Sequence, residues 1–157
     1  MITKEEHHKA LDAVRKTEFA ARVDDLNALR EVYGEQVEEI VKASRAKKIE
    51  ANWRKIAEQH GRNDIQGMKD TLWKWVLDEG IEYDVTDTEE GSQFQVTRCP
   101  LAEMARELNA SHWGFICFCE DDPPMVAGFN PDMGFRRTKT LMQGDDCCDH
   151  FYYMKDG

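Results

Sequence analysis

The residue types best suited to chemistry gather near the C-terminal end of this 157-residue chain. They occupy four short segments: Cys99-Pro100, residues 119–122 (CEDD), residues 136–140 (RRTKT) and residues 144–150 (GDDCCDH). Thiols and carboxylates with a histidine nearby permit nucleophilic attack by a thiolate, general acid–base catalysis by a carboxylate, or metal ligation. The alternative for the aspartates of the last segment is turn formation, because an Asp side chain accepts hydrogen bonds from nearby backbone N–H groups.

The chain has five cysteines, and all of them follow residue 98. They are Cys99, Cys117, Cys119, Cys147 and Cys148. An odd count behind a charged N-terminal segment favours reduced thiols over the disulfide framework of a secreted protein. Cys99, Cys119, Cys148 and His150 would supply four zinc ligands, although their spacing matches no standard zinc motif. The alternative for any one of these cysteines is a small buried apolar residue.

Composition excludes several kinds of partner. The net charge is −10, from 21 Lys and Arg against 31 Asp and Glu, so the chain lacks the basic footprint that binds nucleic acid or an anionic membrane. Its densest apolar run, residues 113–118, is far too short to cross a bilayer. We therefore expect a cytoplasmic protein with no nucleic-acid and no membrane partner. The length suits a single domain over residues 1–157.

The chemistry-bearing segments need a scaffold, and residues 1–79 predict a helical one. Residues 4–33 are rich in good helix formers and contain no proline, and Gly34 is the natural break. Residues 35–60 repeat apolar side chains at spacings of three and four, which is typical of a helix with one apolar face. Gly61 is placed to end this second helix as a C-terminal cap.

The same periodicity predicts a third helix that opens with Asn63 as its N-cap and ends at Gly80. The side chains expected to share its apolar face are Ile65, Met68, Leu72, Trp75 and Val76. For the tryptophans Trp53, Trp73 and Trp75, anchoring the packing of helices is a better interpretation than a platform for a ligand.

After Gly80 the apolar period changes to two, which predicts strands in residues 80–157. Residues 81–86 and 94–97 form a hairpin pattern, and residues 135–142 and 148–154 form a second pair that turns at 143–146. A short helix is expected at residues 101–108. Residues 111–122 suit a helix or a strand, with Pro123-Pro124 as the stop. The fold class is therefore α+β: long N-terminal helices packed on a small antiparallel sheet with additional short helices.

The order of the C-terminal motifs resembles the L-2-amino-thiazoline-4-carboxylic acid hydrolase family. The motifs are Cys99-Pro100, Cys119-x-x-Asp122, Phe129-Asn130-Pro131, residues 135–141 (FRRTKTL) and Gly144-Asp145-x-x-Cys148-Asp149, and the match extends over about residues 60–154. The resemblance implies a small-molecule substrate and a hydrolase that opens the ring of a cyclic isothiourea amino acid at a C–N or C–S centre.

Such a reaction needs an acid to protonate the ring, a base or nucleophile, and a cation for the substrate carboxylate. Asp122 and Asp149 are the candidate acid and base, and Cys119 or Cys148 is the candidate nucleophile if a neighbouring histidine lowers its pKa. Arg136 is the candidate carboxylate clamp, because Arg137 would face the other side of a strand. The residues expected to bind substrate are thus Arg136, Cys99 and His150.

Two other classes of function stay open from the sequence. The C-terminal Cys/Asp/His cluster would also serve a non-catalytic module that binds a ligand or metal or senses redox state. Alternatively, the first two helices would mediate self-association into a homo-oligomer through their apolar faces. The sequence identifies no cofactor, and a divalent metal is the one candidate that the cluster suggests.

Overall fold

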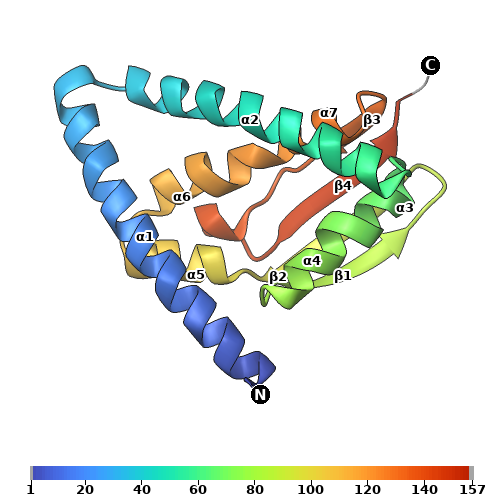
Figure 1. Cartoon of the computed structure of the whole chain (residues 1–157), viewed down its shortest axis with the longest axis horizontal. Coiled ribbons are helices and arrows are strands. Elements are labelled where there is room, and N and C mark those ends of the chain that lie inside the picture. The colour runs from blue at the N-terminus through green and yellow to red at the C-terminus, as the bar shows by residue number, and fades with distance from the viewer. Residues whose placement is uncertain (1, 156–157) are drawn as a thin grey trace.

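The computed structural model describes residues 2–155, and two long helices, α1 (Lys4–Tyr33) and α2 (Gln36–His60), dominate its outline. They meet at Gly34 in a V, and the remaining elements lie between and beside its arms (Figure 1). Thr3 caps the start of α1 by accepting a hydrogen bond from the Glu6 N–H. Gly34 and Gly61 end the two helices at φ of 72° and 75°, a region that glycine adopts without steric cost. Both predicted helices are confirmed.

The third helix differs from the prediction in its cap and in its register. Asp64, rather than Asn63, is the N-cap, and its carboxylate accepts the Gly67 N–H at 2.9 Å. α3 (Ile65–Met68) then continues through a π-helical turn, Lys69–Trp73, into α4 (Lys74–Asp78). A π-turn holds one more residue than an α-turn, which rotates the face that follows.

This rotation places Trp73 on the buried face of the helix and Trp75 on the exposed face. Trp73 is 4% exposed, whereas Trp75 is 45% exposed and its ring is tilted against that of Trp53, with 5.9 Å between ring centroids. The prediction that placed Trp75 on the inner face was therefore wrong, because 3.6-residue periodicity takes no account of the extra residue.

A four-stranded antiparallel sheet forms the other half of the protein, which confirms the α+β class. Its order is β1 (Glu82–Asp87), β2 (Ser92–Arg98), β4 (Cys148–Met154) and β3 (Met133–Arg136). Strand β3 ends at Arg136, earlier than the predicted residue 142. The reason is that the next backbone N–H groups bond to side chains: Asp149 accepts from Thr138 and Lys139, and Asp145 accepts from Thr140.

The segment between β2 and β3 is helical. It consists of α5 (Pro100–Glu107), α6 (Ser111–Phe118), a 3-10 turn at Cys119–Asp121 and α7 (Asp122–Phe129). The sequence pattern suggested that Pro123 and Pro124 stop the preceding helix. Instead, they lie in the first turn of α7. Proline is tolerated in a first helical turn because its missing N–H would have no partner there. α7 packs closely on α2.

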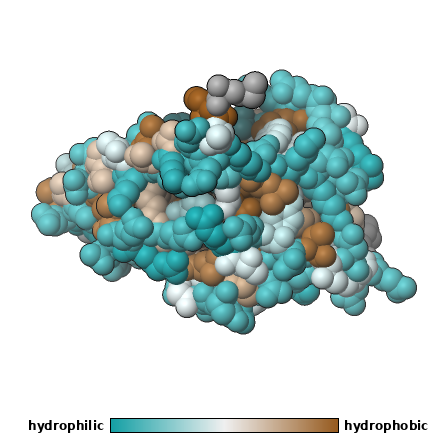
Figure 2. All heavy atoms as spheres, turned by 90° about the horizontal axis from the view of Figure 1, so that it is seen from below, coloured by the Kyte–Doolittle hydropathy of each residue, from teal (hydrophilic) through white to brown (hydrophobic). Residues whose placement is uncertain are grey.

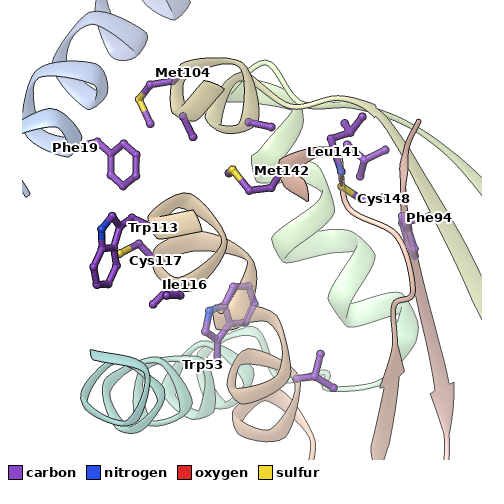
Figure 3. Packing of buried hydrophobic residues seen from close by; sticks show 14 of the residues in the cluster. Phe19, Trp53, Phe94, Met104, Trp113, Ile116, Cys117, Leu141, Met142 and Cys148 are labelled. Atoms are coloured by element: carbon purple, nitrogen blue, oxygen red, sulfur yellow. Dashed lines mark hydrogen bonds between the residues drawn. The ribbon is translucent and has the colours of Figure 1, made fainter. Parts of the chain in front are cut away.

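A continuous cluster of buried side chains joins the V of helices to the sheet. In Figure 3, Phe19 of α1 faces Trp113 and Cys117 of α6, and Met142 lies between these helices and Cys148 of β4. The cluster continues along the inner face of the sheet through Phe94. This packing holds the start of α7 and the inner face of β4 at fixed positions.

The face of the molecule drawn in Figure 2 carries little extended apolar area. In the view of Figure 2 most side chains are hydrophilic, and the hydrophobic ones form small separate groups. Large exposed apolar side chains near the tip of the V are Leu29, Val32, Tyr33 and Ile40. Among residues 2–155, no helix combines the length and apolar composition that a bilayer crossing requires.

Candidate functional site

A cavity of about 110 Å³ lies between the π-helical turn, the inner face of β2 and β4, the start of α5 and the start of α7. Its apolar lining residues are Leu72, Val76, Ile81, Val96, Leu101, Phe118 and Met142. The polar or reactive lining residues are Trp73, Cys99, Cys119, Asp122, Arg137, Cys148, His150 and Tyr152. A single water molecule needs only about 10–15 Å³ of such space, so the cavity has room for a small molecule.

Strand alternation selects which C-terminal residues reach the cavity. Cys148, His150 and Tyr152 of β4 line it, whereas Asp149 and Phe151 lie on the opposite face of the strand. A wider, open groove of about 880 Å³ runs over that opposite face. We place the candidate site in the smaller cavity, because the buried polar groups lie there.

Asp122 is the electrostatic centre of the cavity. One oxygen, Oδ2, accepts hydrogen bonds from both Arg137 Nη1 and His150 Nε2, the latter at 3.2 Å. Arg137 Nη1 also donates to the Cys119 carbonyl at 3.1 Å. The side chains of Asp122, Arg137 and His150 are 17%, 9% and 11% exposed, so this ionic group is largely shielded from water. Shielding strengthens each charge–charge interaction within it.

The two adjacent arginines lie on opposite faces of the sheet, as the alternation predicts. The one that faces the cavity, however, is Arg137 and not Arg136. Met133 of β3 is buried and Phe135 packs against the core, so the next residue on that face is Arg137, which lines the cavity. Arg136 is exposed, and its guanidinium lies 4.6 Å from the centre of the Phe151 ring on the outer face. Arg136 therefore lines the open groove on the outer face and not this cavity, because local alternation does not define its own phase.

Three thiols line the cavity, and burial raises the pKa of each. The pKa of Cys148 is raised to about 11, and those of Cys99 and Cys119 are raised as well. Burial is the main cause in all three cases because it disfavours the thiolate. The expectation that His150 lowers a thiol pKa is thus not met. The other cysteines, Cys117 and Cys147, are buried outside the cavity lining.

The four candidate zinc ligands, Cys99, Cys119, Cys148 and His150, all line the cavity. Within residues 2–155, however, no three His, Cys, Asp or Glu side chains are arranged so that they could hold a metal ion. The four residues thus lie around one cavity, but in this part of the chain they are not arranged to bind a metal ion.

The hydrogen bonds of Asp149 support the interpretation that its side chain stabilises a turn. Its Oδ1 accepts the Thr138 and Lys139 N–H groups at 2.8 and 2.6 Å, and the Thr138 hydroxyl donates to Oδ2 at 2.5 Å. Burial alone would raise the pKa of Asp149, but these hydrogen bonds outweigh it, and the pKa is lowered overall.

Asp149→Asn is therefore expected to lower the free energy of unfolding at pH 7 by about 1.5–3 kcal/mol, because the bonds to a charged acceptor are weakened. A carboxyl group whose pKa is lowered in the folded state stabilises the fold above its unfolded pKa, and this contribution is lost as the pH falls through the folded pKa. Urea unfolding at pH 7 and near pH 2 should show the difference between variant and wild type shrinking in acid. An equal difference at both pH values would contradict this role.

Two buried polar atoms that belong to residues of the cavity lining have no hydrogen-bond partner among the described residues. They are His150 Nδ1 and Trp73 Nε1. Buried polar groups in proteins are almost always paired, so an unpaired one beside a cavity points toward a ligand. Sequence reasoning selected His150, but it assigned Trp73 to helix packing and did not consider Tyr152.

The chain belongs to the L-2-amino-thiazoline-4-carboxylic acid hydrolase family, to which it matches over residues 14–152. The family resemblance expected from the C-terminal motifs is confirmed, and the match also includes most of the two long helices. No curated protein and no solved structure gives a significant match to the chain.

Proposed function

We propose that the cavity is the active site of a hydrolase that opens a small ring at a carbon between nitrogen and sulfur, on a substrate of the L-2-amino-thiazoline-4-carboxylate type. Family membership supports the reaction class. The observation that carries the proposal is the contact between Asp122 and His150 Nε2 in the cavity lining, together with a His150 Nδ1 that has no hydrogen-bond partner among the described residues.

In this proposal His150 is the general base. A carboxylate that accepts from Nε2–H holds the imidazole in the tautomer whose Nδ1 carries a lone pair, and it stabilises the imidazolium that forms after proton uptake. Asp122 supplies that carboxylate at 3.2 Å. The proposed role of Asp122 is thus to orient and charge-stabilise His150.

Arg137 is the proposed anchor for the substrate carboxylate. Its hydrogen bonds within residues 2–155 use only Nη1, so the Nε and Nη2 donors keep their capacity. These two donors form the fork with which a guanidinium binds a carboxylate in a bidentate way. The rings of Phe115 and Phe135 lie 5.6 and 5.8 Å from the guanidinium carbon and help to hold it in place.

The proposed reaction balances with water as the only co-substrate. Water attacks the amidine carbon and forms the C–O bond of a tetrahedral centre, one of its protons passes to His150 Nδ1, and the π electrons of the C=N bond move to the ring nitrogen. The second proton of the water then moves from the new hydroxyl to the ring nitrogen, the C=O bond forms as the C–S bond breaks, and the sulfur takes up the proton from His150. The product is a carbamoyl amino acid with a free thiol. The raised pKa values of Cys119 and Cys148 favour attack by water over attack by a thiolate, so in this proposal both residues shape the wall.

His150→Asn is expected to lower kcat for thiol release from L-2-amino-thiazoline-4-carboxylate by at least about 100-fold, because it removes the general base. His112→Asn is a matched control, since His112 Nε2 also contacts a carboxylate, Glu38 at 2.9 Å, but lies outside the cavity. The control should keep wild-type kcat. If wild-type protein binds the thiazoline without releasing thiol, the non-catalytic ligand-binding alternative is correct.

A further inference from the structure

Trp73 lies at the cavity wall with a buried indole N–H that has no hydrogen-bond partner among residues 2–155. We propose that this N–H donates a hydrogen bond to an acceptor atom within the ring of the substrate, and so makes Trp73 a substrate-binding residue that selects heterocycles over carbocycles of the same size. The inference rests on the proposed function, because it concerns the substrate of the same cavity.

The indole is held firmly by its neighbours. Its ring stacks on Phe94, with 4.1 Å between centroids and 13° between planes, and it meets the edge of Tyr83 at 4.7 Å. The Tyr83 hydroxyl also donates to the Trp73 backbone carbonyl at 2.9 Å. A ring fixed on two sides cannot turn to find a protein acceptor, so the direction of its N–H is set by the fold.

The backbone under Trp73 supports a role beyond packing. Trp73 is the last residue of the π-helical turn, in which the Lys74 N–H bonds back to the Lys69 carbonyl. π-turns are less favourable than α-turns and occur frequently at functional sites. Without the extra residue, the helix would present a different side chain to the cavity.

The polar groups nearest the indole indicate what ligand fits. The His150 ring lies 5.3 Å from the indole at 72°, and the Tyr152 ring lies 6.0 Å away at 84°. Burial raises the pKa of the Tyr152 hydroxyl, and the nearby indole N–H of Trp73 only partly opposes this rise, although the two groups form no hydrogen bond of normal geometry. Trp73 therefore offers a donor beside the proposed base, and a neutral ring nitrogen is the acceptor that a cyclic amidine-like substrate supplies.

The test is a binding measurement on His150→Asn protein, in which turnover does not interfere. Trp73→Phe removes the N–H and keeps an aromatic ring, and Trp75→Phe is the matched control on the exposed side of the helix. The probes are L-2-amino-thiazoline-4-carboxylate and cyclopentanecarboxylate, which has a five-membered ring and a carboxylate but no acceptor in the ring.

Trp73→Phe should weaken binding of the thiazoline about 10-fold by calorimetry and leave cyclopentanecarboxylate unaffected, and Trp75→Phe should change neither. Equal weakening of both probes would show that the indole contributes only shape, and it would overturn the inference. No weakening of the thiazoline, or no binding of it to His150→Asn protein with Trp73 intact, would also overturn it. Binding without turnover in the wild type would defeat the proposed function alone.

If Trp73→Phe does not fold, β-(3-benzothienyl)alanine at position 73 serves as the second variant. It keeps the bicyclic shape and replaces the N–H with sulfur, so its effect isolates the donor. The same loss of thiazoline binding is expected, and wild-type affinity would overturn the inference.

Discussion

Asp122→Asn is expected to lower kcat for ring opening by about 10²–10⁴-fold, the range typical of a lost acid–base function. The amide keeps the size of the side chain but carries no charge, so it no longer stabilises the imidazolium that His150 forms when it takes a proton. It also leaves the guanidinium of Arg137, 9% exposed, without its counter-charge. Activity should be measured by thiol release at saturating substrate.

The neighbouring residue Asp121 provides the control for this experiment. Its carboxylate pairs with Arg45 through two hydrogen bonds, of 2.5 and 3.0 Å, and its side chain is 16% exposed, against 17% for Asp122. Each substitution removes the negative charge from a partly shielded ion pair and leaves an arginine without its counter-charge. Asp121→Asn should nevertheless keep kcat, because Asp121 lies outside the cavity lining. Equal losses of kcat in the two variants would show that Asp122 has only a structural role.

Arg137→Lys is expected to raise KM for the thiazoline carboxylate about 10- to 100-fold with a smaller change in kcat. Lysine keeps the positive charge beside Asp122, but it lacks the planar fork that binds a carboxylate in a bidentate way. A rise in KM at nearly constant kcat is the signature of lost binding that ground state and transition state share. Steady-state kinetics on folded protein measures both parameters.

Arg136→Lys is the matched variant, because the two arginines are adjacent and lie on opposite faces. Arg136 contacts the Phe151 ring on the outer face, so its replacement should leave KM unchanged. A rise in KM for Arg136→Lys, with none for Arg137→Lys, would restore the assignment made from the sequence. 2-Amino-2-thiazoline, which has no carboxylate, should not distinguish wild type from Arg137→Lys.

Local signals in the sequence predicted the elements whose ends depend on neighbouring residues alone. Gly34 and Gly61 end the long helices at positive φ, and the alternation of residues 148–154 defines strand β4. The motif order also identified the family, and the motif residues that line the cavity are Cys99, Cys119, Asp122, Arg137 and Cys148. These features are determined by the backbone preferences and spacing of residues close together in the chain.

Tertiary contacts decided which of the predicted residues share the site. The phase of β3 is set by the packing of Met133 and Phe135 on the core, so Arg137 and not Arg136 reaches the cavity. The π-turn that brings in Trp73 has no signature in apolar periodicity. Carboxylates at Asp145 and Asp149 end the strand by accepting N–H groups that a neighbouring strand would otherwise bind.

The sequence alone thus determined an α+β protein of the L-2-amino-thiazoline-4-carboxylic acid hydrolase family with its reactive residues near the C-terminal end. Only the tertiary structure decided that Asp122, Arg137 and His150 meet at one carboxylate oxygen and that the thiols around them have raised pKa values. The physical reason is that hydrogen-bond geometry and desolvation depend on residues far apart in the chain, and spacing within one segment does not encode them.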